Sequence, residues 1–112
     1  MKLVIGGYSQ GKLAYVKQNM CPETGDPVIL NDLHLLVRDC LSEGRCPEEE
    51  ITDFLKEHPD CIVICDEIGN GIVPMDAFER EYRERTGRIL MELAKQAEEV
   101  VRVICGIGQK IK

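Results

Sequence analysis

The sequence has no long apolar run and no excess of positive charge. No stretch of about 18 consecutive apolar residues occurs, so we expect no membrane-spanning helix and no membrane partner. The residues before Gly6 are too few to form a secretory signal, which indicates a cytoplasmic protein. The formal net charge is −6 without a basic patch, which disfavours a nucleic acid as the main partner. Any phosphate ligand would therefore have to be bound by nearby backbone amides and single side chains, without help from a broad positive surface.

The cysteines lack the spacing of a metal or redox motif. There are 6 cysteines but no C-x-x-C pair, so we expect neither a zinc site nor a disulfide framework. Cys61, Cys65 and Cys105 lie inside apolar runs, where a cysteine behaves as a small hydrophobic residue. In a strand, Cys61 and Cys65 would point to the same face. This pattern indicates reduced thiols in a cytosolic protein.

Histidine is also scarce. His34 lies on a helical pattern, and His58 precedes a proline in a predicted loop. No partner for either side chain can be read from its spacing to other residues. We therefore assign neither histidine a catalytic role.

A glycine-rich segment follows the first apolar run. Gly6, Gly11 and Lys12 have the spacing G-x-x-x-x-G-K of a phosphate-binding loop. Glycines allow successive backbone amides to turn toward one point, and the helix that follows directs its positive end there. Lys12 would add a charge for the outer phosphates of a nucleotide. The segment predicts a nucleotide site made of Gly6, Gly7, Tyr8, Ser9, Gln10, Gly11 and Lys12.

Leu13 departs from the usual motif. The loop normally continues with a serine or threonine whose hydroxyl binds Mg²⁺, and leucine cannot bind a metal ion. The pattern therefore favours phosphate binding over phosphoryl transfer. A glycine-rich turn between a strand and a helix, without any ligand, is the alternative.

Apolar runs and helical patterns alternate along the 112 residues, which indicates one domain, 1–112. The first three predicted strands are each followed by helical patterns, and this order predicts an α/β fold with a mainly parallel central sheet flanked by helices. We expect strands at 2–5, 28–30, 61–65, 100–105 and, at the edge, 109–112, and helices at 11–18, 33–42, 47–58 and 77–99.

Acidic residues follow two of the predicted strands. Asp32 comes after the strand at 28–30, and Asp66 and Glu67 come after the strand at 61–65. Ligands of parallel sheets bind at the carboxyl ends of the strands, so these acids and the phosphate loop would share one site. Asp66 would bind Mg²⁺ through water, or Glu67 would position a hydroxyl group. The alternative roles are a helix cap, above all for Asp32, and a loop anchor.

A second glycine-containing segment follows these acids. Gly69, Asn70 and Gly71 form either a plain turn or a loop that contacts the substrate. The segment 72–74, Ile-Val-Pro, is unusually apolar for a surface turn, which favours packing on a ligand or on a neighbouring subunit. Together with the short core, it favours a homo-oligomer.

Several of these segments match the pattern of one family. The stretch 67–74, E-I-G-N-G-I-V-P, is highly specific to it, and Gly6–Lys12 matches its phosphate loop. Further matches are Tyr82-Arg83, Gly87 and the carboxyl-terminal segment 103–112. On these residues the chain resembles the adenosylcobinamide kinase / adenosylcobinamide-phosphate guanylyltransferase family of cobalamin synthesis. The resemblance implies a P-loop-type three-layer α/β fold, assembled as a small cyclic oligomer.

The resemblance also implies a reaction. The family phosphorylates the aminopropanol hydroxyl of adenosylcobinamide with ATP or GTP and Mg²⁺, and then transfers GMP to that phosphate through a guanylylated histidine. By the match, Lys12 and Glu67 are the candidate catalytic residues, and Asp32 contacts the nucleotide or its metal ion. Asp66 is a second candidate metal ligand. The residues Gly69, Asn70 and Gly71 would form the substrate loop.

The chain departs from the family pattern at several positions. The segment 15–27 is too short for the strand and helix that carry the family's GMP-accepting histidine, and neither His34 nor His58 stands in that context. Leu13 replaces the metal-binding serine, and Leu90 stands where the family usually has asparagine. We therefore expect a purine-nucleotide-binding protein with weak or no kinase activity and no guanylyl transfer. The alternative is a non-catalytic relative with a binding or regulatory role.

Overall fold

A five-stranded sheet runs through the computed structural model, which describes residues 1–21, 25–68 and 76–112. The strand order is β2-β3-β1-β4-β5. The first four strands are parallel and β5 is antiparallel to β4, which confirms the predicted α/β fold with a mainly parallel sheet. The strands are β1 (Lys2–Gly6), β2 (Ile29–Leu30), β3 (Ile62–Asp66), β4 (Glu99–Ile104) and β5 (Ile107–Lys110).

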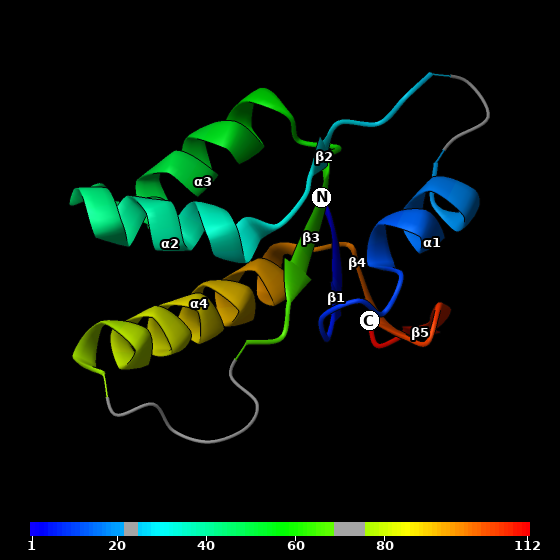
Figure 1. Cartoon of the computed structure of the whole chain (residues 1–112). Coiled ribbons are helices and arrows are strands. Elements are labelled where there is room, and N and C mark those ends of the chain that lie inside the picture. The colour runs from blue at the N-terminus through cyan, green and yellow to red at the C-terminus, as the bar shows by residue number, and fades with distance from the viewer. Residues whose placement is uncertain (22–24, 69–75) are drawn as a thin grey trace.

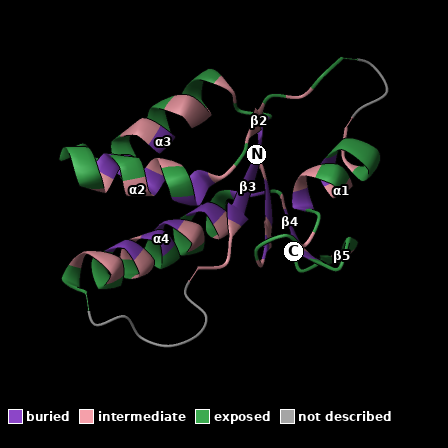
Figure 2. Ribbon diagram, in the orientation of Figure 1, coloured by how far each residue is buried: buried purple, intermediate pink, exposed green. Residues whose placement is uncertain are grey.

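Helices cover both faces of this sheet, as Figure 1 shows. On one face, α2 (Leu33–Glu43), α3 (Pro47–Glu57) and α4 (Ala77–Gln96) pack with Val63 and Cys65. On the other face, α1 (Lys12–Asn19) places Val16 against Val4, Ile62 and Ile64. Figure 2 shows the buried residues along the sheet and on the helix surfaces that face it. This is the predicted three-layer arrangement.

The strand β3 is apolar on both sides because both of its faces are covered. Its residues Ile62 to Cys65 are all buried, as is typical of a central parallel strand. β1 lies between β3 and β4, and its pairing with β3 runs from Lys2 opposite Ile62 to Gly6 opposite Asp66. The glycine that opens the phosphate loop thus lies beside the acid that ends β3.

Most helix boundaries follow the sequence signals, and the end of α4 is an exception. The carboxylate of Asp76 caps α4 by accepting hydrogen bonds from the amides of Phe78 and Glu79. The helix ends at Gln96, three residues before the predicted end. Ala97 is already extended and buried, because Glu99 begins β4. No helix within residues 1–21, 25–68 and 76–112 is long and apolar enough to cross a membrane.

The cysteines are all free thiols, in agreement with the sequence. Cys61 and Cys65 are buried in the same core cluster, as their spacing predicts. The prediction for Cys105 is wrong, because this residue is exposed and has a φ of 51°. With Gly106, whose φ is 76°, it forms the two-residue turn between β4 and β5. Two consecutive left-handed residues are typical of a tight hairpin turn, which a strand prediction for Cys105 overlooks.

Candidate functional site

The chain leaves β1 and β3 toward opposite faces of the sheet. After β1 it enters α1 on one face, and after β3 it continues to α4 on the other face (Figure 1). Such a divergence opens a crevice at the carboxyl ends of the two strands, where ligands of open α/β sheets bind. The main-chain amide of Glu67 donates a hydrogen bond to the oxygen of Gly6 at 2.8 Å, which holds the two strand ends together.

The glycines of the phosphate loop have distinct physical roles. A side chain at Gly6 would place its Cβ 2.5 Å from the main-chain oxygen of Val103, so only glycine fits there without a shift. Gly11 precedes α1 with a φ of 83°, in the left-handed region that glycine adopts without strain. Ser9 is also left-handed, with a φ of 56°. These positive φ values turn the chain tightly from β1 into α1.

Most backbone amides of residues 7–12 have no acceptor within the described residues. Tyr8 and Ser9 form a hydrogen-bonded turn, which engages one amide of the loop, and the other amides are left for a ligand. Some carbonyl groups of the loop are occupied, since the oxygen of Gln10 accepts from the amide of Gly106 at 2.8 Å. Free amides next to the start of a helix are the groups that bind a phosphate.

Lys12 connects the loop to β3. Its side chain is only 7% exposed, and its Nζ donates a hydrogen bond to the oxygen of Gly7 at 2.6 Å. The same Nζ lies 2.6 Å from Oδ1 of Asp66, whose side chain is 15% exposed. This ion pair places a positive charge between the loop and the end of β3. A lysine ammonium has three N–H groups, so one remains for a further acceptor.

Asp32 stands at the N-cap position of α2, but the capping role considered for its carboxylate is wrong. Its side chain makes no capping hydrogen bond, and its backbone is left-handed with a φ of 55°. Aspartate tolerates this conformation, which the abrupt turn from the two-residue strand β2 into α2 requires. The carboxylate is thereby left for other contacts. Its ligand atom and those of His34 and Asp66 all lie within 4.8 Å of one another.

His34 is a member of the site that sequence reasoning missed. It is buried in the first turn of α2, and its Nδ1 accepts a hydrogen bond from the amide of Asp66 at 3.2 Å. Its Nε2 lies 3.4 Å from Oδ2 of Asp66. The partner is 32 residues away, so no spacing rule could identify it. One sequence feature could have pointed to His34: it is a polar residue between two leucines, shortly after the end of a predicted strand.

A cavity of about 380 Å³ joins these groups. Tyr8 stands at its rim with 84% of its surface exposed, so it does not pack in the core. The cavity brings together the predicted loop residues 8–12, Asp32 and Asp66, and it adds His34 and Leu35. Leu13 also lines it at the position where the motif has a hydroxyl group.

Glu67 lies outside this cavity. Its Oε2 is 3.1 Å from a guanidinium nitrogen of Arg102 on β4, so the pair spans the end of β1. No local sequence pattern indicates this partner, because Arg102 lies 35 residues further along the chain. The predicted substrate loop, Gly69, Asn70 and Gly71, and the apolar segment 72–74 lie outside the described residues. The homo-oligomer expected from that segment therefore stays a prediction.

The thiol beneath the site is chemically inert. Cys65 precedes Asp66 and is fully buried, and its Sγ donates a hydrogen bond to the oxygen of Asp66 at 3.3 Å. Burial raises the pKa of this thiol to about 12, because a thiolate would lose its hydration. Cys65 is therefore neutral at physiological pH and offers no nucleophile to a ligand.

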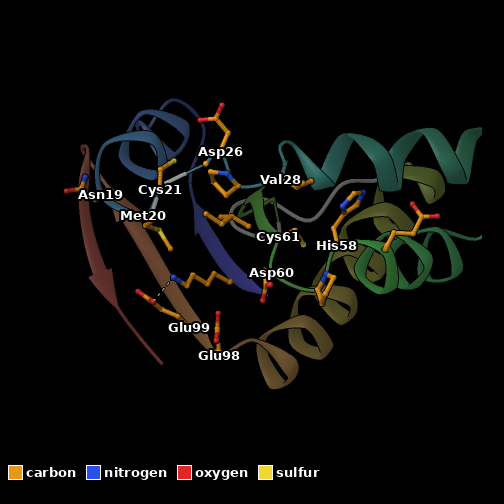
Figure 3. A pocket seen from close by; sticks show the side chains of 16 residues that line it. Asn19, Met20, Cys21, Asp26, Val28, His58, Asp60, Cys61, Glu98 and Glu99 are labelled. Atoms are coloured by element: carbon orange, nitrogen blue, oxygen red, sulfur yellow. Dashed lines mark ion pairs between the residues drawn. The ribbon is translucent and has the colours of Figure 1, made fainter. Parts of the chain in front are cut away.

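A larger cavity, of about 710 Å³, lies at the opposite end of the strands, where β1, β3 and β4 begin (Figure 3). Lys2 contributes a positive charge there, and its Nζ lies 4.0 Å from Oε2 of Glu99. The other charged side chains are acidic and would repel phosphates: Asp26, Glu57, Asp60, Glu98 and Glu99. The smaller cavity at the phosphate loop is thus the better candidate for a nucleotide.

Comparisons with known proteins point to one family. The model of the cobinamide kinase / cobinamide phosphate guanyltransferase family matches residues 8–111. The chain is 33% identical over 82 residues to the bifunctional adenosylcobalamin biosynthesis protein CobU of Salmonella typhimurium, over 73% of this chain and 38% of the relative. It is 43% identical over 51 residues to the protein of that name from Escherichia coli, over 46% of this chain and 28% of the relative. The matches thus span less than half the length of either relative. The chain belongs to the cobinamide kinase / cobinamide phosphate guanyltransferase family.

Proposed function

We propose that this chain binds ATP or GTP at the carboxyl ends of β1 and β3 and transfers the outermost phosphate to adenosylcobinamide. The position of Lys12 is the observation that carries the proposal. Its buried Nζ lies 2.6 Å from both the loop oxygen of Gly7 and Oδ1 of Asp66, at the floor of a cavity. Family membership supplies the acceptor, because the family is described as a cobinamide kinase.

Three groups would bind the nucleotide phosphates. The free amides within residues 7–12 donate hydrogen bonds, and the start of α1 adds its partial positive charge. Lys12 donates the remaining N–H of its ammonium group to the outermost phosphate. The purine base extends toward the exposed Tyr8 and Leu35 at the cavity rim. Each interaction is local, as the net charge of −6 requires.

The carboxylates of Asp32 and Asp66 suit a magnesium ion that arrives with the nucleotide. Their oxygens lie within 4.8 Å of each other, and Mg²⁺ prefers oxygen ligands. When bound, the ion would neutralise the charge that develops on the phosphate oxygens. Oδ1 of Asp66 is already paired with Lys12, and Oδ2, which lies 3.4 Å from Nε2 of His34, would be the oxygen that faces the ion or its water. Because Leu13 has no hydroxyl group, the magnesium ion would lack this ligand, and the rate of phosphate transfer would be low.

Glu67 would act on the acceptor. Its carboxylate accepts a hydrogen bond from the acceptor hydroxyl and orients it, while Arg102 holds Glu67 in place at 3.1 Å. We propose no guanylyl transfer, because the segment 15–27 is too short for the GMP-accepting histidine of the family pattern. A second candidate function is nucleotide binding without turnover, and Leu13 in the cavity wall favours it.

A phosphorylation assay separates the two functions. The natural chain is incubated with Mg²⁺, radiolabelled ATP or GTP and adenosylcobinamide, and labelled adenosylcobinamide phosphate is measured. We expect slow product formation, a rate increase of about tenfold for Leu13→Ser because a metal ligand returns, and no product for Lys12→Met. If the natural chain and Leu13→Ser both bind nucleotide and form no product, the kinase proposal is wrong and the binding function remains.

A further inference from the structure

We infer that the acceptor lies on the open sheet face of β4 and β5, and that Arg102 binds the phosphate group that the acceptor gains. The inference deepens the proposed function and rests on it for the identity of the acceptor. It gives Arg102 a role beyond holding Glu67. Binding measurements that need neither a nucleotide nor turnover can test it.

The ion pair of Glu67 and Arg102 leaves much of each side chain unused. Only Oε2 of Glu67 meets the guanidinium, at 3.1 Å from Nη2. Within the described residues, one of the five N–H groups of Arg102 thus has a protein acceptor, and its Nε lacks one although it is shielded from solvent. Oε1 of Glu67 and Nη1 of Arg102 also have no partner there, and both stay open to solvent. The pair therefore offers a ligand one acceptor and one donor.

This pair adjoins the phosphate loop through the end of β1. The amide of Glu67 donates a hydrogen bond to the oxygen of Gly6 at 2.8 Å, and Lys12 donates to the oxygen of the next residue, Gly7, at 2.6 Å. An outermost phosphate at Lys12 and an acceptor hydroxyl at Glu67 are thus bound beside consecutive residues. Phosphate transfer needs such closeness, because the reacting atoms must come within about 3–3.5 Å of each other.

The sheet face beside Arg102 is apolar and uncovered. Arg102 and Ile104 point to the same face of β4, and Ile107 on β5 pairs with Ile104. The helix α1 covers the opposite face, since a side chain at Gly108 would collide with the ring of Tyr15. Ile104 and Ile107 are 45% and 72% exposed. Because these isoleucines continue directly from Arg102, they suit the body of the acceptor, whose corrin ring has large apolar surfaces.

Phosphate transfer changes what the pair must recognise. Before the transfer, the acceptor hydroxyl donates a hydrogen bond to Oε1 of Glu67. The transfer joins the hydroxyl oxygen to the outermost phosphorus, releases ADP or GDP and gives one proton to water. The acceptor then carries a negative phosphate ester, which the carboxylate of Glu67 repels. Arg102 offsets this repulsion, because its planar N–H groups match phosphate oxygens.

Equilibrium dialysis with adenosylcobinamide and with adenosylcobinamide phosphate tests the inference. We expect Arg102→Leu to weaken binding of the phosphate form about tenfold or more, as for loss of a charge-assisted hydrogen bond, and to leave the other form within about threefold. Ile107→Thr should weaken both forms equally, because it removes apolar contact only. Lys110→Leu removes a positive charge from the opposite face of β5 and should leave both affinities unchanged.

A double variant separates a direct contact from the release of Glu67. Arg102→Leu leaves the Glu67 carboxylate uncompensated, and this charge alone repels a phosphate. We therefore expect Glu67→Gln with Arg102→Leu to bind the phosphate form about tenfold more weakly than Glu67→Gln alone. Equal affinities of these two variants would show that Arg102 only neutralises Glu67, and would overturn the inference. Circular dichroism checks that each variant is folded, and Arg102→Gln replaces a leucine variant that is not.

The other contrary outcomes are distinct from failure of the kinase proposal. Equal losses of both forms in Arg102→Leu, unchanged affinities in Ile107→Thr, or a natural chain that binds neither form would overturn the inference. If the phosphorylation assay yields product while Arg102→Leu binds both forms like the natural chain, the inference fails and the kinase proposal stands. If the assay yields no product while Arg102→Leu loses only the phosphate form, the kinase proposal fails and Arg102 remains a phosphate ligand.

Discussion

The side-chain oxygen of Gln10 accepts a hydrogen bond from the amide of Cys105 at 2.8 Å, although 95 residues separate them. The main-chain oxygen of Gln10 accepts a second bond, from the amide of Gly106, also at 2.8 Å. The turn between β4 and β5 thus holds the middle of the phosphate loop through one glutamine. A loop with three glycines is otherwise free to adopt many conformations.

Replacement of Gln10 by alanine tests this connection. We expect the Cys105 amide to exchange its hydrogen faster, because its acceptor is lost, while the Gly106 amide keeps its main-chain partner. The stability should fall by only about 0.5–1.5 kcal/mol, since the freed amide lies in an exposed turn. Hydrogen exchange followed by NMR measures both amides. Gln18→Ala on the exposed side of α1 is the matched control, and equal exchange in the two variants would refute the connection.

A methyl group at Gly6 should destabilise the fold. Its Cβ would lie 2.5 Å from the main-chain oxygen of Val103, and a backbone atom cannot move aside cheaply. We expect Gly6→Ala to lower the free energy of unfolding by about 1–3 kcal/mol. Gly87→Ala, inside α4 with open space around the new Cβ, should instead raise it by about 0.4–1 kcal/mol. Urea denaturation compares the two, and a neutral Gly6→Ala would contradict the close contact.

The ion pair of Lys12 and Asp66 should show strong coupling. Lys12→Met leaves the Asp66 carboxylate without its charge partner in a site where the side chains are 7% and 15% exposed. We expect this single change to cost about 3–5 kcal/mol of stability, and Lys12→Met with Asp66→Asn to recover most of the loss. The more solvent-accessible pair of Lys2 and Glu99, at 4.0 Å, should couple by at most about 1 kcal/mol. Double-mutant cycles measured by urea denaturation give the coupling energy of each pair. Similar coupling energies for the two pairs would argue against a buried ion pair of Lys12 and Asp66.

The architecture follows from local patterns, and the site depends on distant contacts. The continuous apolar run before Asp66 predicted a buried central strand, because only a strand covered on both faces has that composition. Gly6, Gly11 and Lys12 predicted the loop, since its tight geometry demands those residue types. Both signals lie within a few residues, so a single sequence is sufficient to find them.

The missed features depend on residues far apart in the chain. His34 acquires its role from Asp66, and Glu67 pairs with Arg102 across β1. Local rules also favoured a helix cap for Asp32, whereas the short strand before it imposes a left-handed backbone. Sequence patterns describe the chemistry of each residue along the chain, and the pairing of strands decides which residues meet.

The ion pair of Glu48 and Arg85 should make the stability of the fold depend on pH in the acidic range. The guanidinium of Arg85, through its hydrogen bonds, lowers the pKa of Glu48 from 4.5 to about 2. A carboxyl with a lowered pKa in the folded state stabilises the fold above pH 4.5, and the contribution is lost as the pH falls toward 2. Its magnitude is modest, because the Glu48 side chain is 45% exposed.

Denaturation between pH 7 and pH 2 measures this contribution. Glu48→Gln should be less stable than the natural chain near neutral pH, and the difference should vanish at the acid end. Glu49→Gln, at the neighbouring exposed position of α3, should retain the acid-dependent loss of the natural chain. A difference for Glu48→Gln that stays constant across the pH range would contradict the lowered pKa.

Nucleotide binding to the natural chain is the most direct test of the account. Isothermal titration calorimetry with ATP and with GTP, each with Mg²⁺, should show saturable binding at one site per chain, and Lys12→Met should abolish it. Absence of saturable heat for both nucleotides up to millimolar concentration would contradict the claim that the loop at Gly6–Lys12 is a phosphate site.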